Sequence, residues 1–355
     1  MKNEKIFLSW FGVLNLVLAV LVVLIHTYNA ASYGLEYGKG LESAILWIED
    51  YFSHNLAHIA VPLFFAISGY LYFRTVSFEN IKEKLNRRIH SLCIPFLIWN
   101  FIYLLLFFTL SQIPFLRENV NSVQSVPIDS TTIVSSLLFY KYNYIMWFIY
   151  QLIIYVFLLS PLLIIILRNN IATAITITSL ISLYSIGMLE VPRLSVETMA
   201  VGIYPDMLAY FIIGGVLSRS KLLTLPDTKM LGWTLFIAAQ IIWFFNYSGY
   251  KQWHYNVLNF CFCLFSILGI FLLLSCIKKP CPNVKLASCS FYIFTIHPFL
   301  LECVQKIFYM KLPHNSWGAL IDYTVSPIVT VIICLYIGMF LKKYKINLYH
   351  FLGGR

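Results

Sequence analysis

The chain has 355 residues, of which 60% are hydrophobic and only 11% are charged, and its mean hydropathy is +0.78. This composition excludes a soluble globular domain and indicates a polytopic membrane protein. The net charge of +10 does not indicate a nucleic-acid partner, because the basic residues gather at the ends of apolar runs and sort by membrane side.

The first apolar run covers residues 6–26 and contains few polar residues. At a rise of about 1.5 Å per residue, a helix of this length reaches roughly 30 Å, the thickness of the hydrocarbon core of a bilayer. Lys2 and Lys5 precede the run, so the helix is expected to begin in the cytoplasm and to place His26 near the opposite face. The run exceeds the apolar part of a signal peptide, so we interpret it as a retained membrane helix.

Further apolar runs follow, each bounded by polar or Gly- and Pro-containing breaks. They predict an all-α polytopic membrane protein of about ten helices with both termini in the cytoplasm, where most of the 25 Lys and Arg residues then lie. The whole chain, 1–355, is expected to form one integral-membrane domain with no fused soluble domain. Residues 27–55 and 111–146 are expected to be long outer segments. The predicted spans are 6–26, 56–73, 90–110, 147–167, 171–188, 203–218, 231–247, 255–277, 287–305 and 321–341.

Polar side chains inside membrane spans are costly and usually have a function. The predicted spans contain few carboxylates, which argues against an ion-coupled transporter and leaves histidine and hydroxyl chemistry. His54 and His58 are spaced i, i+4 and share one face of a helix near its outer end. Because two ligands without a third make a poor zinc site, we expect both rings to be solvated at the interface and expect no metal site.

The second span and the segment after it contain two features of interest. The second span ends in PLFFAISGYL, in which Ser68 and Tyr70 are candidates for lining a site, although a packing role explains Ser68 at least as well. Lys84, Arg87 and Arg88 form a basic cluster at the cytoplasmic mouth of the third span. Such a cluster suits a multiply phosphorylated donor, because guanidinium groups bind phosphate in a bidentate way. These residues are equally explained as positive-inside anchors.

The fourth and ninth spans each contribute one candidate residue. Trp147 lies in the MWF segment that opens the fourth span and is either an interfacial anchor or a substrate-stacking side chain. His297 lies in SFYIFTIHP, directly before Pro298, and either bonds a neighbouring helix or takes part in the site.

These segments together resemble a known family. The first-span histidine, PLFFAISGYL, the basic pair before IPF, MWF and SFYIFTIHP occur in the order found in the acyltransferase-3 family of integral-membrane O-acyltransferases, which modify bacterial surface glycans. The resemblance implies an acyl-CoA donor in the cytoplasm, with acetyl-CoA as the first expectation, no permanently bound cofactor, and a glycan or lipid-linked saccharide as acceptor. It also implies a multi-pass protein of the inner membrane and no nucleic-acid partner.

The resemblance also assigns roles to residues. It implies that His26 is the essential first-span histidine of the family, and that Arg87 or Arg88 stands in its arginine motif. The chain departs from the family pattern at two positions. Asn15 stands where an arginine often precedes the histidine by eleven residues, and Ser91 stands where an arginine often follows Arg88 at i+3.

The expected chemistry is acyl transfer to a hydroxyl. An alcohol at neutral pH is a poor nucleophile, so a neutral imidazole must take its proton as the attack begins, and His26 is the candidate base. A second route is that His26 transiently carries the acyl group. The alternative without catalysis is that His26 only caps the end of the helix at the membrane interface. The rival function is a transporter or flippase of a lipid-linked sugar or an acyl donor. The absence of visible inverted repeats speaks against that rival.

Overall fold

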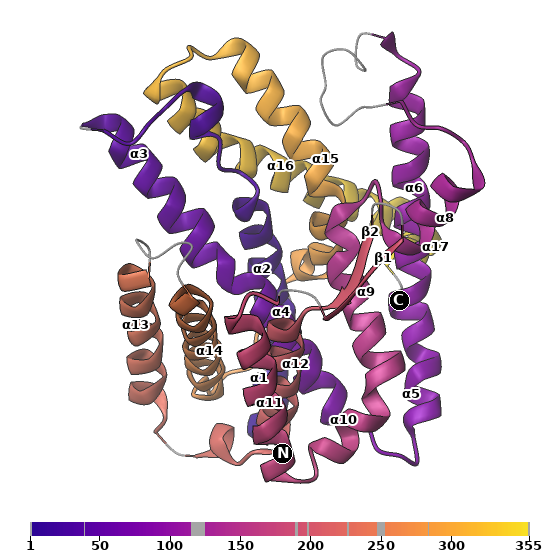
Figure 1. The fold of residues 1–355 in the computed structure, drawn as a ribbon, viewed down its shortest axis with the longest axis vertical. Helices are drawn as coiled ribbons and strands as arrows, with labels where there is room; N and C mark the ends of the chain where they lie inside the picture. The colour runs from indigo at the N-terminus through magenta and orange to yellow at the C-terminus, as the bar shows by residue number, and fades with distance from the viewer. Residues whose placement is uncertain are drawn as a thin grey trace.

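The computed structural model describes residues 2–38, 40–114, 125–188, 191–196, 199–225, 227–246, 253–282 and 284–353. This part of the chain is almost entirely helical (Figure 1), which confirms the expectation of an all-α membrane protein. The exception within the described ranges is one antiparallel hairpin, formed by β1 (Val191–Val196) and β2 (Met199–Ile203).

The first half of the chain forms the helices of the first four predicted spans. Three of its segments, η2, η4 and η6, are π-helical turns within longer helices, where one extra residue widens the turn. In chain order the elements are α1 (Lys2–Ser9), α2 (Phe11–Ile25), η1 (Ala30–Tyr33), α3 (Leu41–Glu49), η2 (Asp50–Leu56), η3 (Ala57–Ile59), α4 (Ala60–Phe73), α5 (Ile81–Arg88), η4 (Ile89–Cys93), α6 (Ile94–Ser111), α8 (Ser130–Phe139), η5 (Tyr144–Met146), α9 (Trp147–Ile153), η6 (Ile154–Leu159) and α10 (Ser160–Ile166).

Several helices in the second half of the chain begin at residues that commonly start helices. The side chains of Asn169 and Asn315 accept backbone N–H groups at the first turns of α11 and α16, and Pro205 opens α12. The elements are α11 (Asn170–Ser185), α12 (Pro205–Arg219), η7 (Leu222–Thr224), α13 (Lys229–Asn246), α14 (Trp253–Ser275), η9 (Lys285–Cys289), α15 (Ser290–Lys311), α16 (Ser316–Tyr344) and α17 (Ile346–Gly353).

Each of the ten predicted spans falls on a helix, but the helices differ in length. Among the described residues, seven helical segments are long and apolar enough to cross a membrane. The fifth, sixth and seventh predicted spans correspond to α11, α12 and α13, which are not among those seven. The chain is thus a multi-pass membrane protein, and the count of ten and the cytoplasmic position of both termini stay predictions.

The second half of the expected outer segment 27–55 is helical. Residues 41–73 form one continuous helical segment that includes α3, η2, η3 and α4. Glu49, Ser53 and Asn55 interrupt the apolar pattern of this segment, and all three are buried. In the second long segment, 111–146, residues 130–139 form α8, and residues 115–124 lie outside the described ranges.

The helices α4 and α12 touch backbone to backbone at the centre of the molecule. A Cβ atom added to Gly69 would lie 1.9 Å from the carbonyl oxygen of Phe211, and one added to Gly214 would lie 2.0 Å from that of Ala66. Only glycine permits this approach, which is a common way for membrane helices to pack. The large buried side chains around the contact, among them Phe65, fix the position of α4 relative to the rest of the core.

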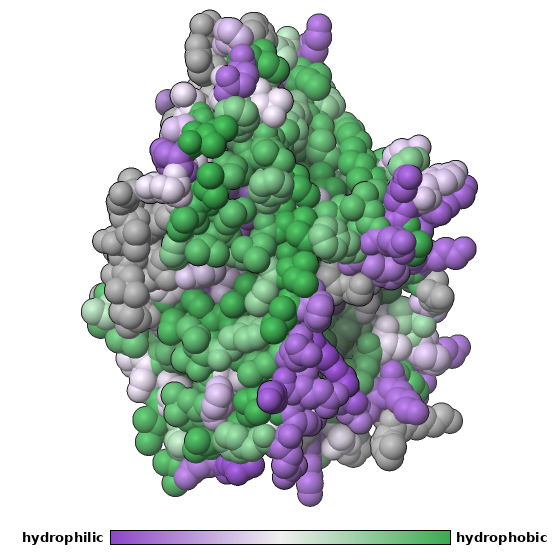
Figure 2. Space-filling model, turned by 90° about the vertical axis from the view of Figure 1, so that its right-hand side faces the viewer, coloured by the Kyte–Doolittle hydropathy of each residue, from purple (hydrophilic) through white to green (hydrophobic). Residues whose placement is uncertain are grey.

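The surface is apolar over most of the face seen in Figure 2. On α6, the outward-facing side chains of Leu97, Phe101 and Leu105 follow one another at i, i+4 and i+8, and each is more than two-fifths exposed. A soluble protein seldom exposes so wide an apolar area, so this face is suited to lipid. Hydrophilic side chains gather low on the same face, at the height of α5 (Figure 2).

Candidate active site

A cavity of about 180 Å³ lies inside the helical bundle at the carboxyl end of α2. Side chains from α2, η3, α4, η5, α9, α12 and α15 line it. Most of them are apolar, and the imidazoles of His26 and His58 and the indole of Trp147 are the groups that can form hydrogen bonds. A mostly apolar cavity with a few converging polar groups has the usual composition of a small-molecule site.

His26 caps the carboxyl end of α2 and turns its ring into the protein. The ring of His297 on α15 stacks against it, with ring centres 5.7 Å apart and planes 26° apart. The ring of Tyr144 on η5 meets it edge to face at 5.6 Å. Three segments that are far apart in the sequence therefore bring a base, a second imidazole and a phenol together at one wall of the cavity.

The turn that follows α2 is fixed by side chains from two other helices. Gln305 on α15 donates its amide N–H to the carbonyl oxygen of Thr27 at 2.7 Å. One carboxylate oxygen of Glu49 accepts the backbone N–H groups of Asn29 at 3.2 Å and Ala30 at 3.1 Å. Because a buried carboxylate needs such partners, these contacts hold the backbone on the far side of the candidate base in one conformation.

Some of the residues singled out in the sequence meet at this cavity and others do not. Trp147 lines it together with His26, and His297 lies directly behind His26. Ser68 is half-buried on α4 and is not among the residues that line the cavity. Tyr70 packs instead in an aromatic cluster, with its ring 5.5 to 5.7 Å from those of three phenylalanines, Phe7, Phe11 and Phe271.

The predicted donor-binding residues lie at the opposite end of α4 from the cavity. Lys84 donates to the hydroxyl of Thr75 at 3.1 Å, and Arg87 pairs with Glu83 one turn before it on α5. The guanidinium of Arg88 lies 6.0 Å from the ring centre of Tyr72. Since Phe64 lines the cavity and Arg88 lies against Tyr72, eight residues later, the two regions are separated by roughly 12 Å along α4.

Sequence reasoning missed three residues of the site. The expectation that His58 is solvated at the interface is wrong, because its ring faces the internal cavity, whereas His54 is exposed and lies against Tyr28. Tyr144 was noted only as part of an aromatic segment, 140–144, expected to be an interfacial belt or a substrate-facing lip, and Glu49 was not singled out. A carboxylate in an apolar stretch was an available signal for Glu49, since membrane helices rarely carry one without a function.

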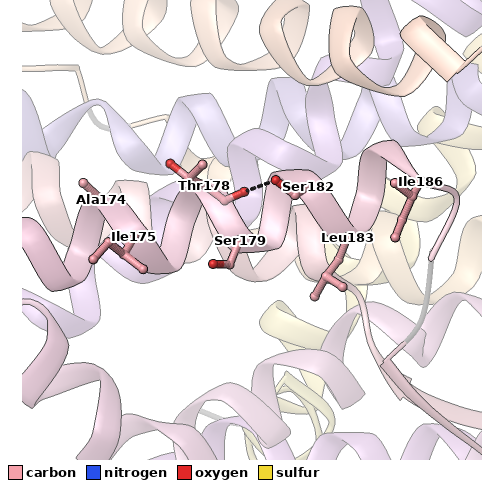
Figure 3. A pocket seen from close by; sticks show the side chains of 7 residues that line it. All are labelled: Ala174, Ile175, Thr178, Ser179, Ser182, Leu183 and Ile186. Atoms are coloured by element: carbon pink, nitrogen blue, oxygen red, sulfur yellow. Dashed lines mark hydrogen bonds between the residues drawn. The ribbon is translucent and has the colours of Figure 1, made fainter.

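A second hollow of about 590 Å³ lies open on the surface of α11. Figure 3 shows that its lining comes from one face of this single helix, and that the hydroxyl of Ser182 bonds back to the carbonyl of Thr178, at 2.9 Å. The lining contains short hydroxyls and apolar side chains but no acid, base or thiol. It therefore offers no group for proton transfer, and the cavity beside His26 is the better candidate site.

Comparison with known proteins identifies the family. The model of the acyltransferase-3 family, described as an acyltransferase domain, matches residues 8–339 and so covers most of the chain, from α1 to near the end of α16. No curated protein and no solved structure matches the chain. The chain belongs to the acyltransferase-3 family and is a multi-pass membrane acyltransferase.

Proposed function

We propose that the protein is an O-acyltransferase of the inner membrane that moves an acyl group, with acetyl as the first candidate, from cytoplasmic acyl-CoA to a hydroxyl of a cell-surface or lipid-linked glycan. The observation that carries this proposal is the ring of His26 on the wall of an internal cavity, with His297 and Tyr144 against it. A ring that merely capped α2 would face lipid or water instead.

In this reaction His26 acts as the general base. Its neutral ring takes the proton of the acceptor hydroxyl while the oxygen attacks the carbonyl carbon of the thioester. The new C–O bond forms, the C–S bond breaks, and the imidazolium returns the proton to the departing thiolate. The products are the glycan ester and free CoA, so the step needs no oxidant, metal or bound cofactor.

The basic residues at the other end of α4 are proposed to hold the phosphates of the donor. Lys84, Arg87 and Arg88 lie on α5, and in this proposal the nucleotide part of acyl-CoA stays beside them in the cytoplasm. The pantetheine arm of acyl-CoA is long and flexible, so the thioester can reach into the bundle while the phosphates stay outside. This arrangement supports a donor and an acceptor that approach from opposite faces.

Arg88→Ala is expected to raise the KM for acetyl-CoA by about tenfold or more, and Arg87→Ala by much less. Arg88 is half-buried against Tyr72 and forms no ion pair within the described ranges, so its donors are free for phosphate. Arg87 is exposed and already paired with Glu83, and an exposed pair of this kind contributes little. Steady-state kinetics with acetyl-CoA as the varied substrate measure the difference, and equal effects of the two substitutions would contradict the assignment.

Mass spectrometry of surface glycans tests the proposed function itself. Cells with the intact protein are expected to carry glycans with an added acetyl mass. Cells that lack the protein, or that carry His26→Ala, are expected to lose this mass. If the protein is instead a flippase, another enzyme adds the acetyl group. The acetyl mass on each delivered sugar would then be the same with His26→Ala as with the intact protein, and this result would contradict the proposal.

A further inference from the structure

We infer that His297 is a positioning residue for His26, which orients the ring of the base and stabilises the positive charge that the base acquires. The inference rests on the proposed function, because it assigns His297 a role in the same reaction. It is carried by the arrangement of the two rings and by the hydrogen bonds of His297.

A hydrogen bond to its own helix sets the tautomer of His297. Its Nδ1 lies 2.9 Å from the carbonyl oxygen of Ile293, one helical turn earlier on α15. A carbonyl oxygen only accepts hydrogen bonds, so in the neutral ring Nδ1 carries the hydrogen and Nε2 keeps a lone pair. The residue that follows, Pro298, has no backbone N–H, so the helix is already irregular at this turn.

The other ring nitrogen of His297, Nε2, has an unused lone pair. His297 is fully buried, and its Nε2 has no hydrogen-bond partner among the described residues. A buried acceptor without a donor is unfavourable, so such a group usually has a partner in the working protein. Nε2 therefore requires a donor from a ring nearby or from a bound molecule.

The ring of His26 is the nearby donor that we infer for Nε2 of His297. The ring of His26 is near His297, with ring centres 5.7 Å apart and planes only 26° apart. Because Nδ1 of His297 is held by Ile293, the ring that turns is that of His26, and we infer that its rotation directs one ring nitrogen at Nε2 of His297. Tyr144 meets the ring of His26 from another side, edge to face, and can also donate its hydroxyl hydrogen.

In this arrangement His297 orients the catalytic histidine, as the third residue of a catalytic triad does. One nitrogen of His26 donates to the lone pair of His297, so the other nitrogen is left free to take the proton of the acceptor hydroxyl. When that proton arrives, the fixed acceptor of His297 stabilises the imidazolium at no cost in reorientation. A carboxylate plays this part in hydrolases, and here a neutral ring would play it within an apolar core.

The activity test compares His297→Phe, His297→Gln and the control His314→Phe. His314 is exposed, contacts the backbone carbonyl and ring of Tyr309 near the end of α15, and lies outside the cavity lining. Transfer of radiolabel from acetyl-CoA is measured in membrane vesicles that contain each variant and the cell's own glycan acceptors. His297→Phe is expected to lower kcat by about 10²-fold with little change in the KM for acetyl-CoA. His297→Gln is expected to recover part of the loss, because its amide oxygen can accept in place of Nε2.

Nitrogen NMR of protein labelled at histidine provides a readout that does not depend on activity or on the stability of a variant. In the intact protein His297 is expected to be the Nδ1–H tautomer, and His26 is expected to populate one tautomer. In His297→Phe, His26 is expected to become a mixture of two tautomers. Hydrogen on Nε2 of His297, or a folded His297→Phe variant with kcat within threefold of the intact protein, would overturn the inference.

The outcomes also separate this inference from the proposed function. If the intact protein transfers no acyl group, the proposed function fails, and the tautomers of the two rings still decide the inference. If His26→Ala abolishes transfer and folded His297→Phe does not, the inference alone fails.

Discussion

His26→Ala is expected to lower acyl transfer by about 10³-fold or more while leaving the fold intact. Without the ring of His26 the proposed general base is lost, and His58 is the one other imidazole among the described residues that line the cavity; general-base catalysis contributes about 10²- to 10⁴-fold. The backbone N–H of His26 makes the cap contacts of α2 and stays in the variant, and the ring borders a cavity, so its loss should not destabilise the bundle. Single-turnover transfer of radiolabelled acetyl groups from acetyl-CoA measures the effect on the chemical step.

His54→Ala is the matched control for this experiment. His54 lies near the same end of the bundle but is exposed, and it is not among the residues that line the cavity. Its substitution should leave the rate within about twofold of the intact protein. A His26→Ala variant that retains more than a tenth of the rate would show that the base lies elsewhere, and His58 would then be the next candidate because it lines the same cavity.

Gly69→Ala and Gly214→Ala are each expected to destabilise the protein by about 3 kcal/mol or more, at the upper end of overpacking effects. A methyl group at either position would lie 1.9 to 2.0 Å from a backbone carbonyl oxygen of the facing helix, which is far inside van der Waals contact. No side chain can move aside to relieve the overlap, so α4 and α12 must separate along their length. The thermal unfolding midpoint of the purified protein in detergent, followed by circular dichroism, reports the loss.

Gly12→Ala is the control for the glycine substitutions. Gly12 lies within α2, where an added Cβ would be 3.7 Å from the Cβ of Ala287, an ordinary contact. Alanine favours a helix over glycine by about 1 kcal/mol, so this variant should unfold at the same temperature or slightly higher. Equal midpoints for all three variants would mean that the two helices do not touch as described.

The helices themselves could be predicted from the sequence because apolar runs of sufficient length are a local signal. The first span, 6–26, is helical from α1 through α2 and ends where His26 was expected to lie. The start of the second span could not be placed correctly. Glu49 and Asn55 interrupt the apolar pattern when only their neighbours in sequence are considered, whereas in the fold their polar atoms bond to the turn that follows α2 and to α13.

The site was only partly predictable, because its geometry depends on contacts between distant segments. His26 and His297 are separated by most of the chain, and no local pattern places one ring against the other. The family resemblance drew attention to both rings and to Trp147, but it did not single out Tyr144. Nor could sequence reasoning tell that Tyr70, which lies in one of the same motifs, packs in an aromatic cluster away from the cavity.

The close contact between α4 and α12 has a mechanical consequence for substrate entry. Two helices in backbone contact are expected to move as one rigid unit, so the part of the cavity lined by Pro62 and Met207 should change little. Access for an acceptor larger than the cavity must then come from movement of the other lining segments, among them the start of α9 with Trp147 and Phe148. The rings of Trp147 and Phe148 would then move relative to α4 and α12, which stay in contact through Gly69 and Gly214.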